Sequence, residues 1–326
     1  LKEAEPLLTA GQVMAYAQLP VVTKQACSGD CSKMLAQGHG KKKMKLAAKK
    51  DNVVAVTTPN LTFKIDRSTG LISEYAYNGK SLLGEGGTLK PNFWRAPTDN
   101  DMGAGLQKKF KAWKNPQMNL KNIDVKKDKK TNSVTILTSF DMPEVQGQMD
   151  ITYVVFANTG AVKVTEDFKA TEGAKVSDMF RFGMLMQMPY TMEKSNYYGR
   201  GPIENYSDRK DCMRIGVYTD DADNQYFPYI RPQESGTKSD IRWWKQTDAT
   251  GMGLQVKSCA PFYASAIHFD TEELDDGNDK DQRHSFDLKK SKFTNLFLDS
   301  AHMGVGGENS WGAWPLEKYR VHYGNK

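Results

Sequence analysis

The sequence has few cysteines and no long apolar segment. Its 326 residues include four cysteines and no run of about 18 apolar residues, so we expect neither a disulfide framework nor a transmembrane helix. Cys27 and Cys31 lie close in sequence, but without a second such pair they do not complete a tetrahedral zinc site. A local disulfide and two free thiols are equally compatible with this spacing, and Cys212 and Cys259 stand singly.

Motifs of several enzyme classes are also missing. The sequence contains neither G-x-S-x-G, the nucleophile elbow of many hydrolases, nor H-E-x-x-H, a zinc-binding pattern. His268 and His322 fall on predicted strands and are interpreted as structural, whereas His302 lies beside a candidate site. We therefore assign no catalytic residue, no metal ion and no cofactor to this chain.

Aromatic residues are absent from the two places where positive charge collects. The net charge of +6 gathers in two lysine clusters. Nucleic-acid binding would require aromatic side chains among the basic ones for base stacking. We expect solvated linkers or turns and no nucleic-acid partner, with binding of another anion as the alternative. The clusters are Lys41, Lys42, Lys43, Lys45, Lys49 and Lys50, and Lys126, Lys127, Lys129 and Lys130.

Alternation of apolar and polar residues predicts strands almost throughout the chain from Asp51 onward. Asn78-Gly79 is a strong hairpin signal because both residues tolerate a positive φ. A single short helix is expected from Leu106 to Trp113. Many short strands with little helix predict an all-β fold, a large antiparallel β-sandwich. The runs lie at 61–65, 75–77, 134–138, 151–155, 162–164, 263–269, 296–298 and 319–323.

Composition divides the chain into three parts. Residues 1–22 contain one predicted strand, Val13 to Gln18, which must pair with a preceding segment or dock onto the rest because one strand cannot form a domain. Residues 23–50 are rich in Ser, Gly and Lys and are predicted to be a linker. Residues 51–326 are predicted to form the sandwich. With neither an initiator Met nor a leader at Leu1, we expect a piece cut from a longer protein, and both cytoplasm and periplasm stay open.

Two stretches combine turn-forming and charged residues. In residues 92–103, the acids and amide of Asp99, Asn100 and Asp101 either cap a helix or line the rim of a ligand pocket, followed by a flexible loop at Gly103 to Gly105. In residues 197–209, two carboxylates lie near two arginines, which favours an ion-paired corner over an acid–base pair. These charged residues are Arg200, Glu204, Asp208 and Arg209.

A third stretch, residues 302–315, is rich in glycine and contains two tryptophans, Trp311 and Trp314. No helix pattern follows, so a phosphate-binding loop is not favoured. A tryptophan in such a loop can offer a flat apolar face to a sugar ring, with Asn309 and Ser310 binding sugar hydroxyls. Burial of one or both tryptophans in the core is the alternative. His302 at the start of the stretch is a further candidate for sugar contact.

Together these stretches resemble the last domain of bacterial β-galactosidases of glycoside hydrolase family 2. The resemblance rests on Arg95–Gly103, Gly199–Arg209 and Met303–Trp311, in this order, and on Phe227–Gly236. It covers residues 51–326. The segment Thr9–Pro20 is similar to the closing strand of the immunoglobulin-like domain that precedes the last domain in this family.

The resemblance implies both a fold and a division of labour. The final domain of the family is an antiparallel β-sandwich of the galactose-mutarotase-like type. The catalytic acid/base and nucleophile are two glutamates in a (β/α)8 barrel upstream, and β-galactosides are hydrolysed with retention. We therefore expect this chain alone to be inactive and to bind sugar weakly. The complete protein is expected to be a homo-oligomer, with magnesium and sodium held mostly by other domains.

Two features carry over by position from the resemblance. Trp311 corresponds to the tryptophan that the last domain extends into the active site, where it stacks mainly against the aglycone. Gly103 corresponds to the glycine that opens a mobile loop, so Asp99, Asn100, Asp101, Met102, Gly103, Ala104 and Gly105 are expected at the active-site mouth and residues 103–109 to move. The sequence departs from the family pattern at Ala104-Gly105 and at Lys108-Lys109.

The sequence leaves two other functions open as alternatives. A free-standing sugar-binding module would require measurable affinity in the isolated chain. An aldose 1-epimerase would require a histidine acid and a glutamate base facing one pocket, for which His302 and Glu308 are the nearest candidates.

Overall fold

The computed structural model describes residues 1–19, 35, 42–48, 52–279 and 283–326. Within these residues the strands form three antiparallel sheets, which confirms the predicted all-β sandwich. Cys27, Cys31 and most of the predicted linker lie outside the described residues. None of the described helices is long and apolar enough to cross a membrane.

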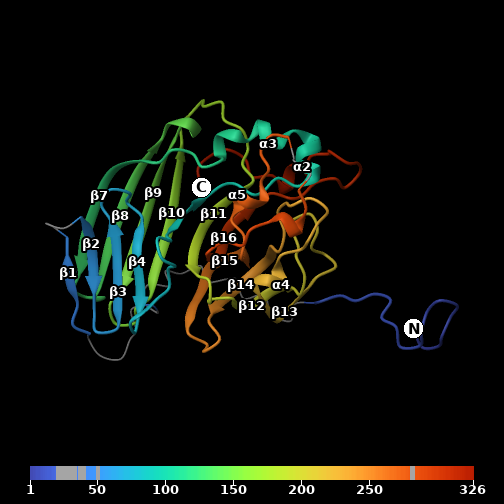
Figure 1. Ribbon diagram of the computed structural model, residues 1–326, viewed down its shortest axis with the longest axis horizontal. Coiled ribbons are helices and arrows are strands. Elements are labelled where there is room, and N and C mark those ends of the chain that lie inside the picture. Colours follow the sequence, from blue (N-terminus) through green and yellow to red (C-terminus); the bar gives the residue numbers. More distant parts are fainter. Residues whose placement is uncertain (20–34, 36–41, 49–51, 280–282) are drawn as a thin grey trace.

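Two of the sheets pack face to face and form one half of the molecule (Figure 1). Phe63 of β3 contacts Tyr153 of β9 with ring centroids 5.9 Å apart, and the Tyr75 hydroxyl donates to the Gly160 carbonyl at 3.1 Å. Alternate residues of β3 and β8 are buried, as the sequence pattern predicts. One sheet contains β1 (Lys45–Ala47), β2 (Val53–Thr57), β3 (Leu61–Asp66), β4 (Ile72–Tyr77) and β5 (Lys80–Ser81); the other contains β7 (Asn119–Asp128), β8 (Ser133–Met142), β9 (Gly147–Phe156) and β10 (Val162–Ala170).

The third and largest sheet forms the other half of the molecule and has the order β13-β12-β14-β15-β16-β11-β6. Trp113 joins this sheet to β10, because its ring lies 5.2 Å from Phe93, just after β6, and 5.6 Å from Phe168 of β10. The strands are β6 (Leu89–Asn92), β11 (Arg181–Pro189), β12 (Lys194–Gly201), β13 (Arg214–Asp221), β14 (Lys238–Thr247), β15 (Gly253–Ile267) and β16 (Phe293–His302).

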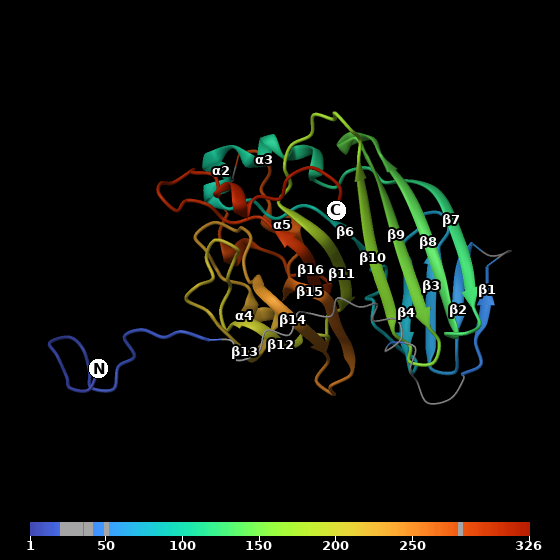
Figure 2. The same ribbon diagram turned by 180° about the vertical axis from the view of Figure 1, so that it is seen from behind.

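Short helices gather mostly at one end of the large sheet. Helices α2 (Asp99–Ala104) and α3 (Leu106–Lys109) and the 3-10 helix η1 (Lys111–Trp113) follow β6. The segment after β16 lies beside α2 in both views of the molecule (Figures 1 and 2). The remaining helical elements are α4 (Ala222–Gln225), α5 (Thr271–Leu274), η2 (Pro143–Val145), η3 (Ser285–Asp287) and η4 (Glu317–Tyr319).

Several local predictions are confirmed. Asn78 and Gly79 form a turn with φ values of 50° and 76°, as expected for residues that tolerate the left-handed region. The predicted helix from Leu106 to Trp113 forms as two pieces, α3 and η1, which meet at Phe110. Apolar residues of both pieces are buried, which explains their helical spacing in the sequence.

Two strand predictions and part of the linker prediction need correction. Residues 1–19 contain only an isolated bridge between Glu5 and Leu8, and where the segment meets the edge strand β13 the side chain of Gln18, not its backbone, bonds to Ile215. Residues 319–323 form the end of η4 and a single bridge between Val321 and Met179; β11 begins just after Met179 and is already flanked by β16 and β6. In contrast, residues 45–47 of the predicted linker form β1, paired with β2.

Candidate functional site

Trp311 is the most exposed tryptophan side chain of the glycine-rich stretch, with 76% of its surface accessible. Asn309 and Ser310 are exposed beside it. Trp314 instead packs edge-on against Phe110, with centroids 5.7 Å apart, and lies under the cations of Lys109 and Arg320. The two tryptophans therefore differ in role: Trp314 packs beneath the loop, and Trp311 presents an apolar surface to solvent.

The root of the Trp311 loop is fixed by a buried ion pair from the first stretch. The Arg95 guanidinium contacts both carboxylate oxygens of Asp101, at 2.8 and 3.1 Å, and both side chains are fully buried. The same guanidinium donates to the carbonyls of Met303 at 2.8 Å and Gly304 at 2.9 Å. A buried arginine needs such partners because an unpaired charge in the interior costs several kcal/mol. The pair thus holds the start of the loop against α2.

Helix α2 begins at Thr98, which forms a capping box with Asp101. The Thr98 hydroxyl accepts from the Asp101 amide at 3.1 Å, and the Asp101 carboxylate accepts from the Thr98 amide at 2.9 Å. Gly105 ends the helix in the left-handed conformation, with φ of 71°. The expected active-site loop is therefore helical from Asp99 to Ala104, with Met102 and Gly103 inside the helix, and its motion stays a prediction.

Asn100 connects this helix directly to the Trp311 loop. Its amide nitrogen donates to the carbonyls of Val305 at 3.0 Å and Ala313 at 2.9 Å, and its oxygen accepts from the Gly312 amide at 2.6 Å. Gly103, three residues further along the helix, leaves so little space that an added Cβ would lie 3.0 Å from the Trp311 ring. The sequence left helix capping and a pocket rim as alternatives for residues 99–101, and it did not indicate that this helix holds the tryptophan loop.

Asp208 of the second stretch holds the same loop from another side. Its carboxylate accepts from the amides of Val305 at 3.0 Å and Gly306 at 2.8 Å. A Cβ on Gly304 would lie 2.3 Å from an Asp208 oxygen, so only glycine fits this approach. The predicted role of Asp208 as an ion-pair partner of a nearby arginine is replaced by this contact with two backbone amides.

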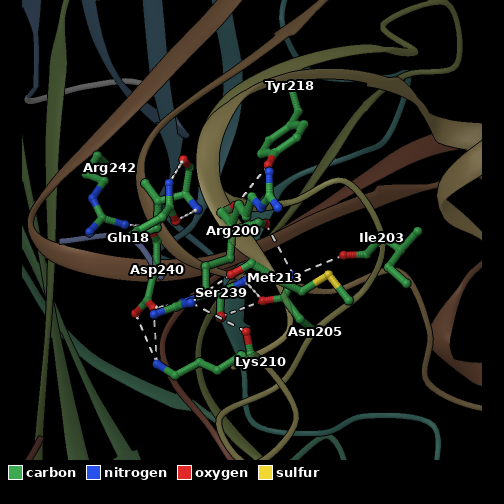
Figure 3. A network of polar contacts seen from close by, with 12 residues as sticks. Gln18, Arg200, Ile203, Asn205, Lys210, Met213, Tyr218, Ser239, Asp240 and Arg242 are labelled. Atoms are coloured by element: carbon green, nitrogen blue, oxygen red, sulfur yellow. Dashed lines mark hydrogen bonds and ion pairs between the residues drawn. The ribbon is translucent and has the colours of Figure 1, made fainter. Parts of the chain in front are cut away.

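The predicted ion-paired corner is correct in one half and wrong in the other. Arg209 pairs with Glu204 at 2.6 Å, as expected. Arg200 instead pairs with Asp240 of β14, which also contacts Lys210 at 3.2 Å (Figure 3). Sequence distance explains the error, because the partner of Arg200 lies 40 positions away on a neighbouring strand.

The Phe227–Gly236 stretch reaches the same region through Gln233 and Glu234. The Gln233 side chain donates to the Asp99 carboxylate and accepts from the Asp99 amide, each at 3.1 Å. The Glu234 amide donates to the Ala96 carbonyl at 3.0 Å, and its carboxylate lies 3.5 Å from Arg181. All four stretches singled out in the sequence therefore meet around the helix α2 and the loop that carries Trp311.

His302 lies beneath this loop rather than at its surface. It is 3% exposed, and its ring meets Tyr206 and Tyr263 edge-on. Burial, with the nearby cations of Arg181 and Arg95, holds its pKa well below the ordinary 6.5, so the imidazole is neutral. This burial argues against the prediction that His302 contacts substrate, which stays a prediction.

The neighbours of His302 form a buried polar cluster that sequence reasoning missed. Arg181 contacts Asp299 at 2.5 Å, and both are buried. Burial raises the pKa of Asp299 to about 6, although the Arg181 charge opposes the shift. Glu308, the other residue considered for epimerase chemistry, is exposed on the loop. A buried neutral histidine and an exposed glutamate do not form the acid–base pair that an epimerase requires.

Two hollows of the described structure lie away from Trp311, which lines neither of them. A hollow of about 540 Å³ is lined by residues 170–174 and 323–325, none of which belongs to the four stretches. No group of three or more His, Cys, Asp or Glu side chains in the described part of the chain is arranged to hold a metal ion. The geometry therefore provides an exposed aromatic surface on a loop held by hydrogen bonds, with exposed amide and hydroxyl groups beside it.

Comparison with known proteins gives consistent matches. Residues 57–326 match the family model described as beta galactosidase small chain. A beta-galactosidase of Priestia megaterium is 29% identical over 272 residues, which are 83% of this chain and 25% of that protein. A beta-galactosidase of Lactobacillus delbrueckii subsp. bulgaricus is 34% identical over 222 residues, 68% of this chain and 21% of that protein. The chain thus spans between a fifth and a quarter of the length of these relatives.

Proposed function

Because this chain belongs to the β-galactosidase small chain family, we propose that it is one part of a longer polypeptide that hydrolyses terminal β-galactosides. In this proposal the chain contributes Trp311 as an aromatic platform for the aglycone. The catalytic glutamates of a retaining mechanism, and any magnesium or sodium ions, lie in the rest of the polypeptide, including a (β/α)8 barrel.

The observation that supports the platform is an exposed indole on a loop that is firmly held. Trp311 is 76% exposed, yet Arg95, Asn100 and Asp208 hold its loop through backbone hydrogen bonds. An exposed apolar ring is unfavourable in water, and its position becomes useful when a ligand covers it. A loop already held in place also loses less conformational entropy when a ligand binds.

A one-sided platform covers only part of a sugar, whereas ligand sites commonly bury most of the ligand surface. We therefore propose that the isolated chain binds galactosides weakly and hydrolyses none. Hydrolysis of a nitrophenyl galactoside by the purified chain would contradict the proposed division of labour. A clear calorimetric signal with lactose would instead favour a free-standing sugar-binding module, and interconversion of galactose anomers, followed by NMR, would favour an epimerase.

Replacing Trp311 by alanine in the complete polypeptide tests the platform directly. We expect KM for an aryl galactoside to rise in Trp311→Ala, because the stacked face is lost. A stacked aromatic pair contributes about 0.5–1.5 kcal/mol beyond buried area, roughly a two- to tenfold change in affinity. Steady-state kinetics measure the effect, and Trp311→Phe is the matched control that should retain most of it. An unchanged KM in Trp311→Ala would show that the indole does not contact substrate.

A further inference from the structure

We propose that Asn100 is the positioning residue for Trp311: its carboxamide sets the conformation of residues 305–313 and thereby the direction of the indole. This inference rests on the proposed function of Trp311 and adds a second residue, on a different element, that controls it. Asn100 itself lies on α2 and is assigned no contact with the sugar.

The contacts of Asn100 match the chemistry of a carboxamide and of no other side chain of its size. The nitrogen donates to two carbonyls, Val305 and Ala313, while the oxygen accepts from the Gly312 amide at 2.6 Å. An aspartate would retain the acceptor but would place an anionic oxygen against two carbonyl oxygens. A leucine would offer no hydrogen bond. The arrangement therefore depends on both atoms of the amide.

Asn100 contacts the loop at both ends of the turn that carries Trp311. Val305 precedes this turn, and Gly312 and Ala313 follow it. The Gly307 amide also donates to the Ala313 carbonyl at 3.1 Å, which closes the neck of the loop. Asn100 thus connects the two ends of the loop at its neck, Val305 on one side and Gly312 and Ala313 on the other. Trp311 lies just before the second of these ends.

The glycines of the loop let Asn100 approach its backbone closely, and without Asn100 this backbone could adopt several conformations. Gly306, Gly307 and Gly312 all have positive φ, at 69°, 75° and 77°. A Cβ on Gly306 would lie 2.7 Å from the Asn100 nitrogen, and one on Gly307 would lie 3.1 Å from its oxygen. Glycine brings conformational freedom to the backbone, so a chain with three such positions needs an external restraint to hold one conformation. Asn100 supplies that restraint.

The same face of α2 also supports the indole itself. Asn100 and Gly103 are separated by three positions, which places them on one side of the helix. Gly103 lies against Trp311 and Gly312, where an added Cβ would meet them at 3.0 and 3.1 Å. Asn100 therefore fixes the loop backbone while Gly103 leaves room for the ring, and a displacement of α2 would displace Trp311.

Asp208 offers a matched comparison because it holds only the first part of the loop. Its carboxylate accepts from the amides of Val305 and Gly306, which both precede Trp311, whereas Asn100 also bonds to Gly312 and Ala313 after it. We therefore expect Asp208→Asn to change the orientation of the Trp311 indole less than Asn100→Asp does.

The test is a double-mutant cycle in the complete polypeptide with Asn100→Asp, Trp311→Ala and both together. We expect Asn100→Asp to raise KM for an aryl galactoside with a smaller effect on kcat, and to add little once Trp311 is alanine, because the two residues act through one contact. An effect of the same size in both backgrounds would overturn the positioning role. If Trp311→Ala itself leaves KM unchanged, the platform fails, which is a different result.

A second measurement keeps the proposal testable if Asn100→Asp is poorly folded. Hydrogen exchange of the Gly312 amide in the 326-residue chain should quicken in Asn100→Ala, which removes the acceptor without adding charge. Iodide quenching of the fluorescence assigned to Trp311, by subtraction of the Trp311→Phe signal, should also change in Asn100→Ala. Exchange and quenching that match the unsubstituted chain would overturn the proposal.

Discussion

At the scale of single residues, buried charge governs the structure below the Trp311 loop. Arg95 and Arg181 are both fully buried, and each is paired with a carboxylate, Asp101 and Asp299 respectively. His302 lies between the two arginines and remains neutral because burial and their charges disfavour its protonated form. Each buried arginine is therefore paired with a carboxylate, and the neutral histidine adds no further positive charge.

The lowered pKa of His302 predicts a specific dependence of stability on pH. The unfolded chain protonates this residue near pH 6.5, whereas the folded chain keeps it neutral, so protons favour the unfolded state below that pH. The free energy of unfolding should therefore fall with decreasing pH, by at most about 1.4 kcal/mol per pH unit. In His302→Gln this contribution should be absent. Urea unfolding at about pH 7.5 and about pH 5.5 measures the difference between the two proteins.

The comparison between proteins matters because Asp299 titrates in the same range with the opposite sign. Its pKa is raised to about 6, so its contribution to stability is lost as pH rises through that value. Only the difference between the two proteins in how the free energy of unfolding changes with pH is therefore due to His302. Identical slopes in the two proteins would mean that the pKa of His302 is the same in the folded and the unfolded chain.

The residues of the candidate site could be predicted only in part from the sequence. Trp311 stood out because an aromatic ring in a glycine-rich loop is poorly placed for core packing, and it is exposed. His302 lay in the same stretch, but its burial depends on Tyr206, Tyr263 and Arg181 from other elements. Burial is a property of the packed fold, and local sequence carries no signal for it at this position.

At the scale of elements, the edge strand β13 is covered by the N-terminal segment rather than by another strand. The Gln18 side chain donates to the Ile215 carbonyl at 2.9 Å and accepts from the Ile215 amide at 2.6 Å (Figure 3). The ring of Tyr16 lies 3.8 Å from the Arg214 guanidinium. Exposed edge strands are open to unwanted pairing, and a side chain that occupies both backbone groups reduces this exposure.

The Gln18 contact predicts a local change in hydrogen exchange. Gln18→Ala removes the acceptor of the Ile215 amide, so we expect this amide to exchange faster while the centre of the sheet is unaffected. Gln12→Ala is the matched control, since Gln12 lies in the same segment and accepts from Thr9 instead. Equal exchange at Ile215 in the two variants would show that Gln18 does not protect β13.

Strand predictions succeeded where the segment pairs with a neighbouring strand through its backbone, and failed where it makes only side-chain contacts or a single bridge. Leu61–Asp66 and Ser133–Met142 alternate and are half-buried between partners, so pattern and pairing agree. Val13–Gln18 alternates equally well but meets only side-chain contacts at β13. Alternation reports that a segment could be half-buried in a sheet. It does not report whether backbone partners exist.

At the scale of the whole molecule, stretches far apart in sequence meet at one end of the large sheet. Arg95 and Asn100, Asp208, and Gln233 reach the loop of Trp311 or the helix beside it. Composition and resemblance identified each stretch separately. Their convergence depends on the three-dimensional path of β11 to β16, which a single sequence does not reveal. The fold class was predictable, whereas the assembly of the site was not.

In the proposed function, the chain has a supporting role in a site that other parts of the polypeptide complete. The chain spans at most about a quarter of the length of the relatives described above. If Trp311 is the platform for the aglycone, it should contribute to the affinity for the aglycone and less to that for the galactosyl ring. This difference between the two parts of the substrate is the central claim.

The most direct test compares the dissociation constants of two competitive inhibitors in the complete polypeptide, before and after Trp311→Ala. One inhibitor is galactose and the other is a phenyl β-thiogalactoside, which adds an aromatic aglycone. The account predicts that the substitution weakens the thiogalactoside by roughly two- to tenfold and galactose by less. Equal weakening of both inhibitors, or no change in either, would contradict it.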